Sequence, residues 1–377
     1  TLRAGGNVFL REVVTETLAG DILNGEINSA YATYVGYDEV AHHSGIRDND
    51  VWSVLKEIDL EINRLENAES ISKRPYEFVI LSDHGQGNGA TFKQRYGITL
   101  GNFVRRFLPE DMKSLRTDEE SDHFRNSYIP KNESIENIRE KMDNIKNHDI
   151  FEEYESLQNI KEKSIDFLKI DELYKSEQIQ TLRKKYSDSL DYIRGYEASQ
   201  HTTKKASDSE LIVLGSGNLG LIYLTQWKHR LTYEEIISLF PDLIPGLVKH
   251  PGIGFILVNS LANGGMVIGK NGIYYLESDE IIGENPLANF GKNAPKHLKR
   301  HNTFKNMPDI LVNSFYDPES GDICAFEELI GSHGGLGGTQ TKPFILYPSD
   351  WNCPDELVGA KSIYDLLKNG MKKLKEE

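Results

Sequence analysis

Residues 76–85 read YEFVILSDHG, and this stretch indicates the fold class of the chain. Its first six residues are mostly apolar, as in a strand that is buried in a parallel sheet. Asp83 and His84 follow the strand at once, and Gly85 supplies the backbone freedom that a tight turn requires. Open α/β folds place their sites at the carboxyl ends of strands. The stretch therefore predicts a functional site that contains Asp83 and His84.

A second polar island follows another predicted strand. Residues 28–37 are rich in β-forming side chains, and residues 37–43 then read YDEVAHH. Asp38 and His42 are four residues apart, which places both side chains on one face of a helical turn. His43 would point away from them, so we assign it a supporting or structural role.

A third island, GSHGG at residues 331–335, places His333 among glycines that let the backbone approach an ion or a phosphate. Aspartate and neutral imidazole are ligands that zinc and similar divalent ions accept. One such island alone is more simply a turn, a helix cap or a packed histidine. Together, the three islands predict one site that binds two divalent ions.

The pattern of apolar residues predicts an α/β protein. Helical spacing covers residues 8–24 and 48–65, and the helix at 48–65 lies between the strands predicted at 28–37 and 76–81. Strand, helix and strand in this order form a βαβ unit. We therefore expect a largely parallel sheet with helices on both faces.

Later core elements are predicted as strands at 210–214, 253–259, 310–312 and 343–347, helices at 232–249 and 361–373, and a hairpin at 266–275 with an Asn-Gly turn. Three regions result. Residues 1–108 form the first part of the core, with the first two islands, and residues 109–207 form a mostly helical acidic and polar insertion. Residues 208–377 continue the core, with a small α+β elaboration at 225–300 and the His333 loop. The insertion is either a solvated helical hairpin without a function of its own or a substrate lid.

Charge limits the classes of partner. The chain has 43 Lys and Arg against 58 Asp and Glu, a net charge of −15. No surplus of cations exists to neutralise nucleic-acid phosphates or an anionic membrane, so we expect neither as a partner. Bound metal ions could still supply positive charge locally for a small phosphate ester. No apolar run approaches membrane-spanning length. Cys324 and Cys353 are expected as two buried free thiols, with a lone disulfide as the alternative.

The three islands resemble motifs of the alkaline phosphatase superfamily, and within it the type I phosphodiesterase/nucleotide pyrophosphatase branch. More narrowly, they are similar to bacterial alkaline phosphatase family proteins with membrane segments upstream. The resemblance covers roughly residues 1–108 and 209–350. It implies an alkaline phosphatase-like fold with two divalent ions, zinc or alternatively manganese. Asp38, His42 and His333 would bind one ion, and Asp83 and His84 the other.

The same resemblance implies a metal-dependent phosphoesterase that hydrolyses a small phosphate ester, a diester rather than a monoester. Superfamily members also use a Thr or Ser nucleophile and a further Asp upstream of the Asp38 island, and neither is found before Asp38. We therefore expect a processed, soluble fragment of a membrane-associated protein. The alternative is a catalytically incomplete metal-binding domain that acts as a scaffold or regulator. A phosphomutase is a third possibility, although it also needs a Ser nucleophile.

One further pattern points elsewhere. Residues 215–220 read GSGNLG and match the dinucleotide fingerprint G-x-G-x-x-G. The fingerprint requires a helix after the glycines, whereas the next residues are typical of a strand. We therefore predict a glycine-rich hairpin at this place. His250, His297 and His301 are expected to have surface or packing roles.

Overall fold

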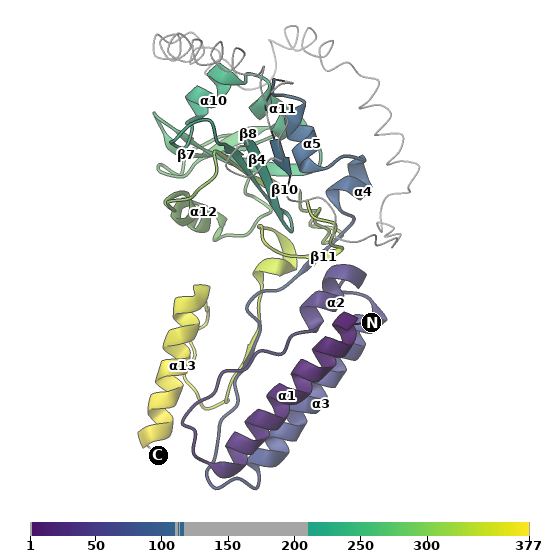
Figure 1. Cartoon of the computed structure of the whole chain (residues 1–377). Helices are drawn as coiled ribbons and strands as arrows, with labels where there is room; N and C mark the ends of the chain where they lie inside the picture. The colour runs from purple at the N-terminus through teal and green to yellow at the C-terminus, as the bar shows by residue number, and fades with distance from the viewer. Residues whose placement is uncertain (1, 110–111, 113, 117–209, 377) are drawn as a thin grey trace. The chain divides into compact units, whose positions relative to one another are not determined.

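The computed structural model describes residues 2–109, 112, 114–116 and 210–376 of the chain, and divides the chain into two compact units (Figure 1). We call residues 1–35, 56–84 and 343–377 the helical unit, and residues 36–55 and 85–342 the sheet unit. The insertion predicted at 109–207 lies almost entirely outside the described residues. Its helical character and its possible role as a lid therefore stay predictions.

The helical unit is built around two long helices. Its elements are α1 (Leu2–Asn24), α3 (Asn49–Glu69) from Lys56 onward, β1 (Ile80–Leu81), β12 (Ile345–Leu346) and α13 (Gly359–Glu376). Helices α1 and α3 lie side by side (Figure 1), and Ile22 and Leu65 are buried between them. The guanidinium of Arg64 joins their polar faces, because it binds Glu12 at 2.9 Å as well as Glu16.

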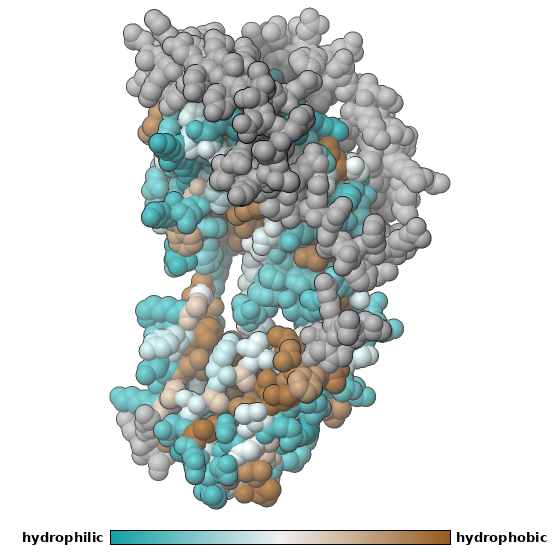
Figure 2. Space-filling model, viewed as in Figure 1, coloured by the Kyte–Doolittle hydropathy of each residue, from teal (hydrophilic) through white to brown (hydrophobic). Residues whose placement is uncertain are grey.

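Only part of the apolar pattern of α1 is used for packing. The end of the helix buries Ile22, whereas Phe9 is 67% exposed and Leu10 is 50% exposed. Brown and teal residues accordingly alternate on the surface of the helical unit (Figure 2). None of the helices in the described part of the chain combines the length and the apolar character that a membrane crossing requires.

The sheet unit contains an eight-stranded sheet in the order β3-β4-β5-β10-β6-β7-β8-β9. The strands are β3 (Ser114–Arg116), β4 (Leu211–Ser216), β5 (Leu219–Leu224), β6 (Ile253–Ser260), β7 (Gly264–Gly269), β8 (Gly272–Tyr275), β9 (Ile281–Gly283) and β10 (Ile310–Ser314). The helices are α2 (Tyr37–Ser44), α4 (Phe92–Tyr96), α5 (Leu100–Arg105), α10 (Tyr233–Leu239), α11 (Leu243–Lys249) and α12 (Ala294–Asn302), followed by a 3-10 turn, η2 (Gly338–Thr341). A separate two-stranded ribbon joins β2 (Gly87–Asn88) and β11 (Gly331–Ser332).

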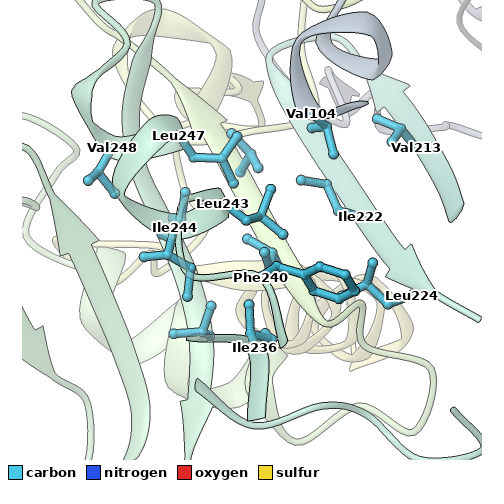
Figure 3. Packing of buried hydrophobic residues seen from close by; sticks show 14 of the residues in the cluster. Val104, Val213, Ile222, Leu224, Ile236, Phe240, Leu243, Ile244, Leu247 and Val248 are labelled. Carbon is cyan, nitrogen blue, oxygen red and sulfur yellow. The ribbon is translucent and has the colours of Figure 1, made fainter. Parts of the chain in front are cut away.

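Helices cover both faces of this sheet. Successive strand residues point to opposite sides, so alternate residues of β6 show which helices lie on each face. Ile256 and Val258 belong to one core with residues of α4, α5, α10 and α11. Phe255 and Leu257, which alternate with them along β6, belong to a second core with residues of α12. Figure 3 shows the first core, in which side chains of α10 and α11 lie over those of β5. The predicted α/β class with helices on both faces is thus confirmed.

The predicted strand direction is wrong for the described residues. Within the large sheet β3 and β4 are parallel, whereas every other neighbouring pair is antiparallel. Tight connections explain the β4–β5, β6–β7, β7–β8 and β8–β9 pairs, because a turn of a few residues can join only antiparallel strands. The turn at Asn271-Gly272 between β7 and β8 is the predicted hairpin, and GSGNLG at 215–220 forms another between β4 and β5.

The predicted βαβ unit is not formed either. Residues 28–36 pair with no strand in the described part of the chain, and β1 is only two residues long. Strand β1 pairs antiparallel with β12. The β-forming side chains of 28–37 instead make isolated contacts, such as the hydrogen bond of 3.0 Å between Tyr34 Oη and Thr15 Oγ1. The helix predicted at 232–249 is divided into α10 and α11, because Pro241 lacks the amide that helical pairing needs.

Candidate metal centre

Helix α2 holds the first two predicted ligands. Asp38 lies in its first turn and His42 one turn later, and Ala41 on the inner face is fully buried. The i, i+4 spacing brings His42 Nε2 to 3.1 Å from Asp38 Oδ2. The same spacing pairs His43 Nε2 with Glu39 Oε1 at 3.4 Å. The sequence thus predicted correctly that Asp38 and His42 share a helical face.

The second ring nitrogen of His42 is fixed by the ribbon strand β11. Nδ1 lies 2.7 Å from the carbonyl oxygen of Gly331. A carbonyl only accepts hydrogen bonds, so Nδ1 carries a proton. Nε2 donates to Asp38 when the ring is protonated, and it presents its lone pair once that second proton is lost. The amide of Ile330 also donates to the His42 carbonyl at 2.9 Å. This arrangement, with one imidazole nitrogen bound to the backbone, is how proteins orient metal-binding histidines.

His333 completes the cluster from the loop after β11. Its Nε2 lies 3.8 Å from Asp38 Oδ1, and the ring centroids of His333 and His42 are 5.2 Å apart. The Asp38 carboxylate therefore has one imidazole on each oxygen. Asp38 and His333 lie near the two ends of the sheet unit in sequence, and the fold brings their side chains together.

Gln86 is a further part of the cluster, which the sequence pattern did not predict. Its side-chain amide donates to Asp38 Oδ1, and the residue is only 7% exposed. The hydrogen bond holds the carboxylate in the orientation that faces both histidines. Its position two residues after His84 in the DHGQ stretch was the available signal.

The cluster favours a charged carboxylate. Burial alone would raise the pKa of Asp38, but hydrogen bonds from His42 and Gln86 and the charges of His42 and His333 outweigh it and lower the pKa to about 2. For His42, burial lowers the pKa, and the Asp38 hydrogen bond and the Gly331 carbonyl reverse this, so the net pKa is raised. A permanently negative group between two imidazoles is a cation-binding arrangement.

Asp83 and His84 belong to the helical unit. They follow β1, where Ser82 and Phe344 exchange hydrogen bonds of 3.1 Å. The amide of His84 donates to Asp83 Oδ1 at 3.1 Å, and the Asp83 side chain is 85% exposed. The chain enters the sheet unit directly after His84. Their assignment to a second ion stays a prediction.

The chemistry of the sheet-unit cluster fits a divalent ion. Two imidazoles and one carboxylate are the protein ligands of many catalytic zinc sites, which leave a position for water or substrate. The Asp38 and His333 side chains remain 49% and 31% exposed, so small molecules can reach them. The fold and this cluster together define an α/β protein with a candidate divalent-ion site.

Comparison with known families gives the identity at the family level. The chain matches the type I phosphodiesterase / nucleotide pyrophosphatase family over residues 6–235, and it belongs to that family. The match confirms the resemblance to this branch of the alkaline phosphatase superfamily, and the α/β structure is consistent with its fold. Asp38, His42, Asp83 and His84 lie within the matched residues, and His333 lies beyond them. No curated protein and no solved structure matches the chain. The family supports a hydrolytic enzyme that acts on phosphate esters.

Proposed function

We propose that this protein is a metal-dependent phosphoesterase that cleaves phosphodiesters in preference to monoesters. The observation that carries the proposal is that Nε2 of His42 and Nε2 of His333 each lie within 4 Å of an Asp38 carboxylate oxygen, in a chain of the phosphodiesterase family. Asp38, His42 and His333 bind one ion, and Asp83 and His84 bind a second. Zinc suits this ligand set, and manganese is the alternative.

Ions at such a site would withdraw charge from the phosphoryl oxygens and stabilise the attacking and leaving oxygens. The residues of the chain prepare the site for them. Asp38 is negative at neutral pH, its lowered pKa keeps it negative in mild acid as well, and Gln86 fixes its orientation. The Gly331 carbonyl keeps the proton of neutral His42 on Nδ1, which leaves Nε2 available.

The charge of the protein is consistent with a small substrate. With a net charge of −15, the chain would repel a long phosphate polymer, whereas a small ester needs only the local charge of the ions. The proposed substrate class is therefore a small phosphate ester. A nucleic acid is not expected as a partner.

The experiment compares ion content and hydrolysis in the same samples. The chain is stripped with chelator and reloaded with zinc or manganese, and bound metal is measured by elemental analysis. Cleavage of bis(p-nitrophenyl) phosphate and p-nitrophenyl phosphate is then followed. For the full-length protein we expect metal-dependent cleavage, faster for the diester, which is lost together with one ion in His333→Ala and lost in Asp83→Asn. His297→Ala, an exposed position on α12, is the matched control.

The outcomes separate the two readings of the site. Unchanged hydrolysis in either His333→Ala or Asp83→Asn would refute the proposed roles. Tight ion binding that depends on His333, without cleavage of either ester, would favour the alternative of a metal-binding scaffold or regulator.

A further inference from the structure

The β4–β5 turn is packed against the backbone of the His333 loop. Gly217 in this turn has φ +55, and a Cβ at this position would lie 1.7 Å from the His333 carbonyl oxygen. The carbonyl oxygen of Gly217 itself accepts a hydrogen bond from the Phe326 amide at 2.7 Å. The GSGNLG stretch that resembles a nucleotide fingerprint is therefore a close-packed support for the loop that carries His333.

Two buried asparagines then bind the residues that follow His333. Asn218 Oδ1 accepts the amide of Gly335 at 2.8 Å, and Asn218 Nδ2 donates to the Leu336 carbonyl at 3.1 Å. Asn313 Oδ1 accepts the amide of Leu336 at 2.7 Å, and its Nδ2 donates to the same carbonyl at 3.1 Å. Asn218 is 0% exposed and Asn313 is 1% exposed. Four hydrogen bonds from strand β10 and the β4–β5 turn thus fix two consecutive residues of the loop.

The loop needs this support because its own sequence does not restrict it. Gly334, Gly337 and Gly338 all have positive φ, and glycine loses more conformational freedom on folding than any other residue. A histidine in such a loop would sample many positions if nothing external held it. The asparagines lie on β10 and at the β4–β5 turn, which are parts of the large sheet.

We propose that Asn218 and Asn313 are positioning residues for the ion site, which set the affinity for a divalent ion by fixing the place of the His333 imidazole. The inference rests on the proposed ion-binding role of Asp38, His42 and His333. It extends that role to two residues that bind the backbone of Gly335 and Leu336 after His333. Outer groups that orient metal ligands typically change metal affinity by tenfold to 100-fold.

The test measures zinc affinity by competition with a chromophoric chelator. We expect Asn218→Ala and Asn313→Ala each to weaken zinc binding by about tenfold to 100-fold. In a His333→Ala background, Asn218→Ala should change the remaining affinity by less than about twofold, because its effect passes through His333. The visible spectrum of bound Co²⁺ should also change in the single variants.

Controls separate positioning from general stability. Asn259→Ala removes an asparagine of β6 that accepts from Asn302 Nδ2 at 3.2 Å, and it should leave zinc affinity unchanged. Asn218→Ser is used if the alanine variant does not fold, as judged by circular dichroism. Wild-type zinc affinity in folded Asn218 and Asn313 variants would overturn the proposal. An equal loss with and without His333 would also overturn it, whereas no zinc binding by the unsubstituted chain would overturn the ion site itself.

Discussion

Lowering the pH should destabilise the sheet unit through His250. The imidazole is 7% exposed and lies between three aromatic rings, with centroid distances of 4.8 Å to Phe92, 4.6 Å to Tyr96 and 4.4 Å to Phe103. Its Nδ1 accepts the amide of Gly252 at 3.0 Å, which requires the neutral ring. Burial, assisted by the charge of Arg106, lowers the pKa of His250 from 6.5 to about 4.

The sign and size of the effect follow from linkage. The unfolded chain takes up the proton near pH 6.5 and the folded chain only near pH 4, so stability is complete above pH 6.5 and falls as the pH drops towards 4. At about 1.4 kcal/mol for each pKa unit, the full loss is about 3 kcal/mol, of which about 2 kcal/mol is reached at pH 5. Below pH 4 the contribution of His250 no longer changes.

Urea unfolding at pH 7 and pH 5 measures this loss, compared between the native sequence and His250→Gln. The comparison removes the contribution that the other titratable groups make to both proteins. We expect the variant to be less stable at pH 7, and its stability to depend less on pH by about 2 kcal/mol. His297→Gln, at an exposed position, should keep the native pH dependence. If His250→Gln kept it as well, the reasoning from burial would be refuted.

Four more predictions concern packing, charge and ion binding. Leu243→Ala removes a fully buried side chain from the core of Figure 3 and should cost about 3 kcal/mol in urea unfolding; a loss below about 1 kcal/mol would contradict the packing described. Asp322→Asn leaves Arg95, whose Nη2 lies 3.2 Å from Asp322 Oδ2, without its buried charge partner, and should cost about 3 kcal/mol by the same assay. Asp365→Asn, which removes an exposed ion pair, should cost less than about 1 kcal/mol. Zinc at 100 times its dissociation constant should stabilise the proposed ion-binding protein by about 2.7 kcal/mol in thermal unfolding; chelator should reverse the gain, and an equal gain in His333→Ala would argue against the site.

The cluster residues on α2 could be predicted because their relation is local. Asp38 and His42 are separated by one helical turn, and that spacing alone brings their side chains together. His333 was found from its glycine-rich surroundings, although nothing in the sequence states its distance from Asp38. The structure adds this distance.

The supporting residues could not be predicted in the same way. Asn218 and Gly335 are 117 residues apart, and the asparagine binds backbone groups that every residue possesses. No residue type at the far end marks such a contact. Gln86 was adjacent to a recognised motif, but a glutamine has many surface uses and its donation to Asp38 depends on the fold.

Strand direction was also beyond the pattern of apolar residues. Strand-forming composition reports that a segment suits a pleated, partly buried surface, and it contains no information on the direction of its neighbour. The short connections between β4 and β5 and between β7 and β8 did contain that information. For this sheet, these short connections predict strand direction better than the apolar run at 76–81 does.

The order of segments has a consequence for biosynthesis. The chain leaves the helical unit after residue 35, returns to it at residue 56, leaves it again after 84 and returns at 343. Because a ribosome makes the chain from its amino end, every segment of the sheet unit is translated before β1 can meet β12. A nascent chain can therefore bring Asp38 and His333 together while one of the three segments of the helical unit has yet to emerge.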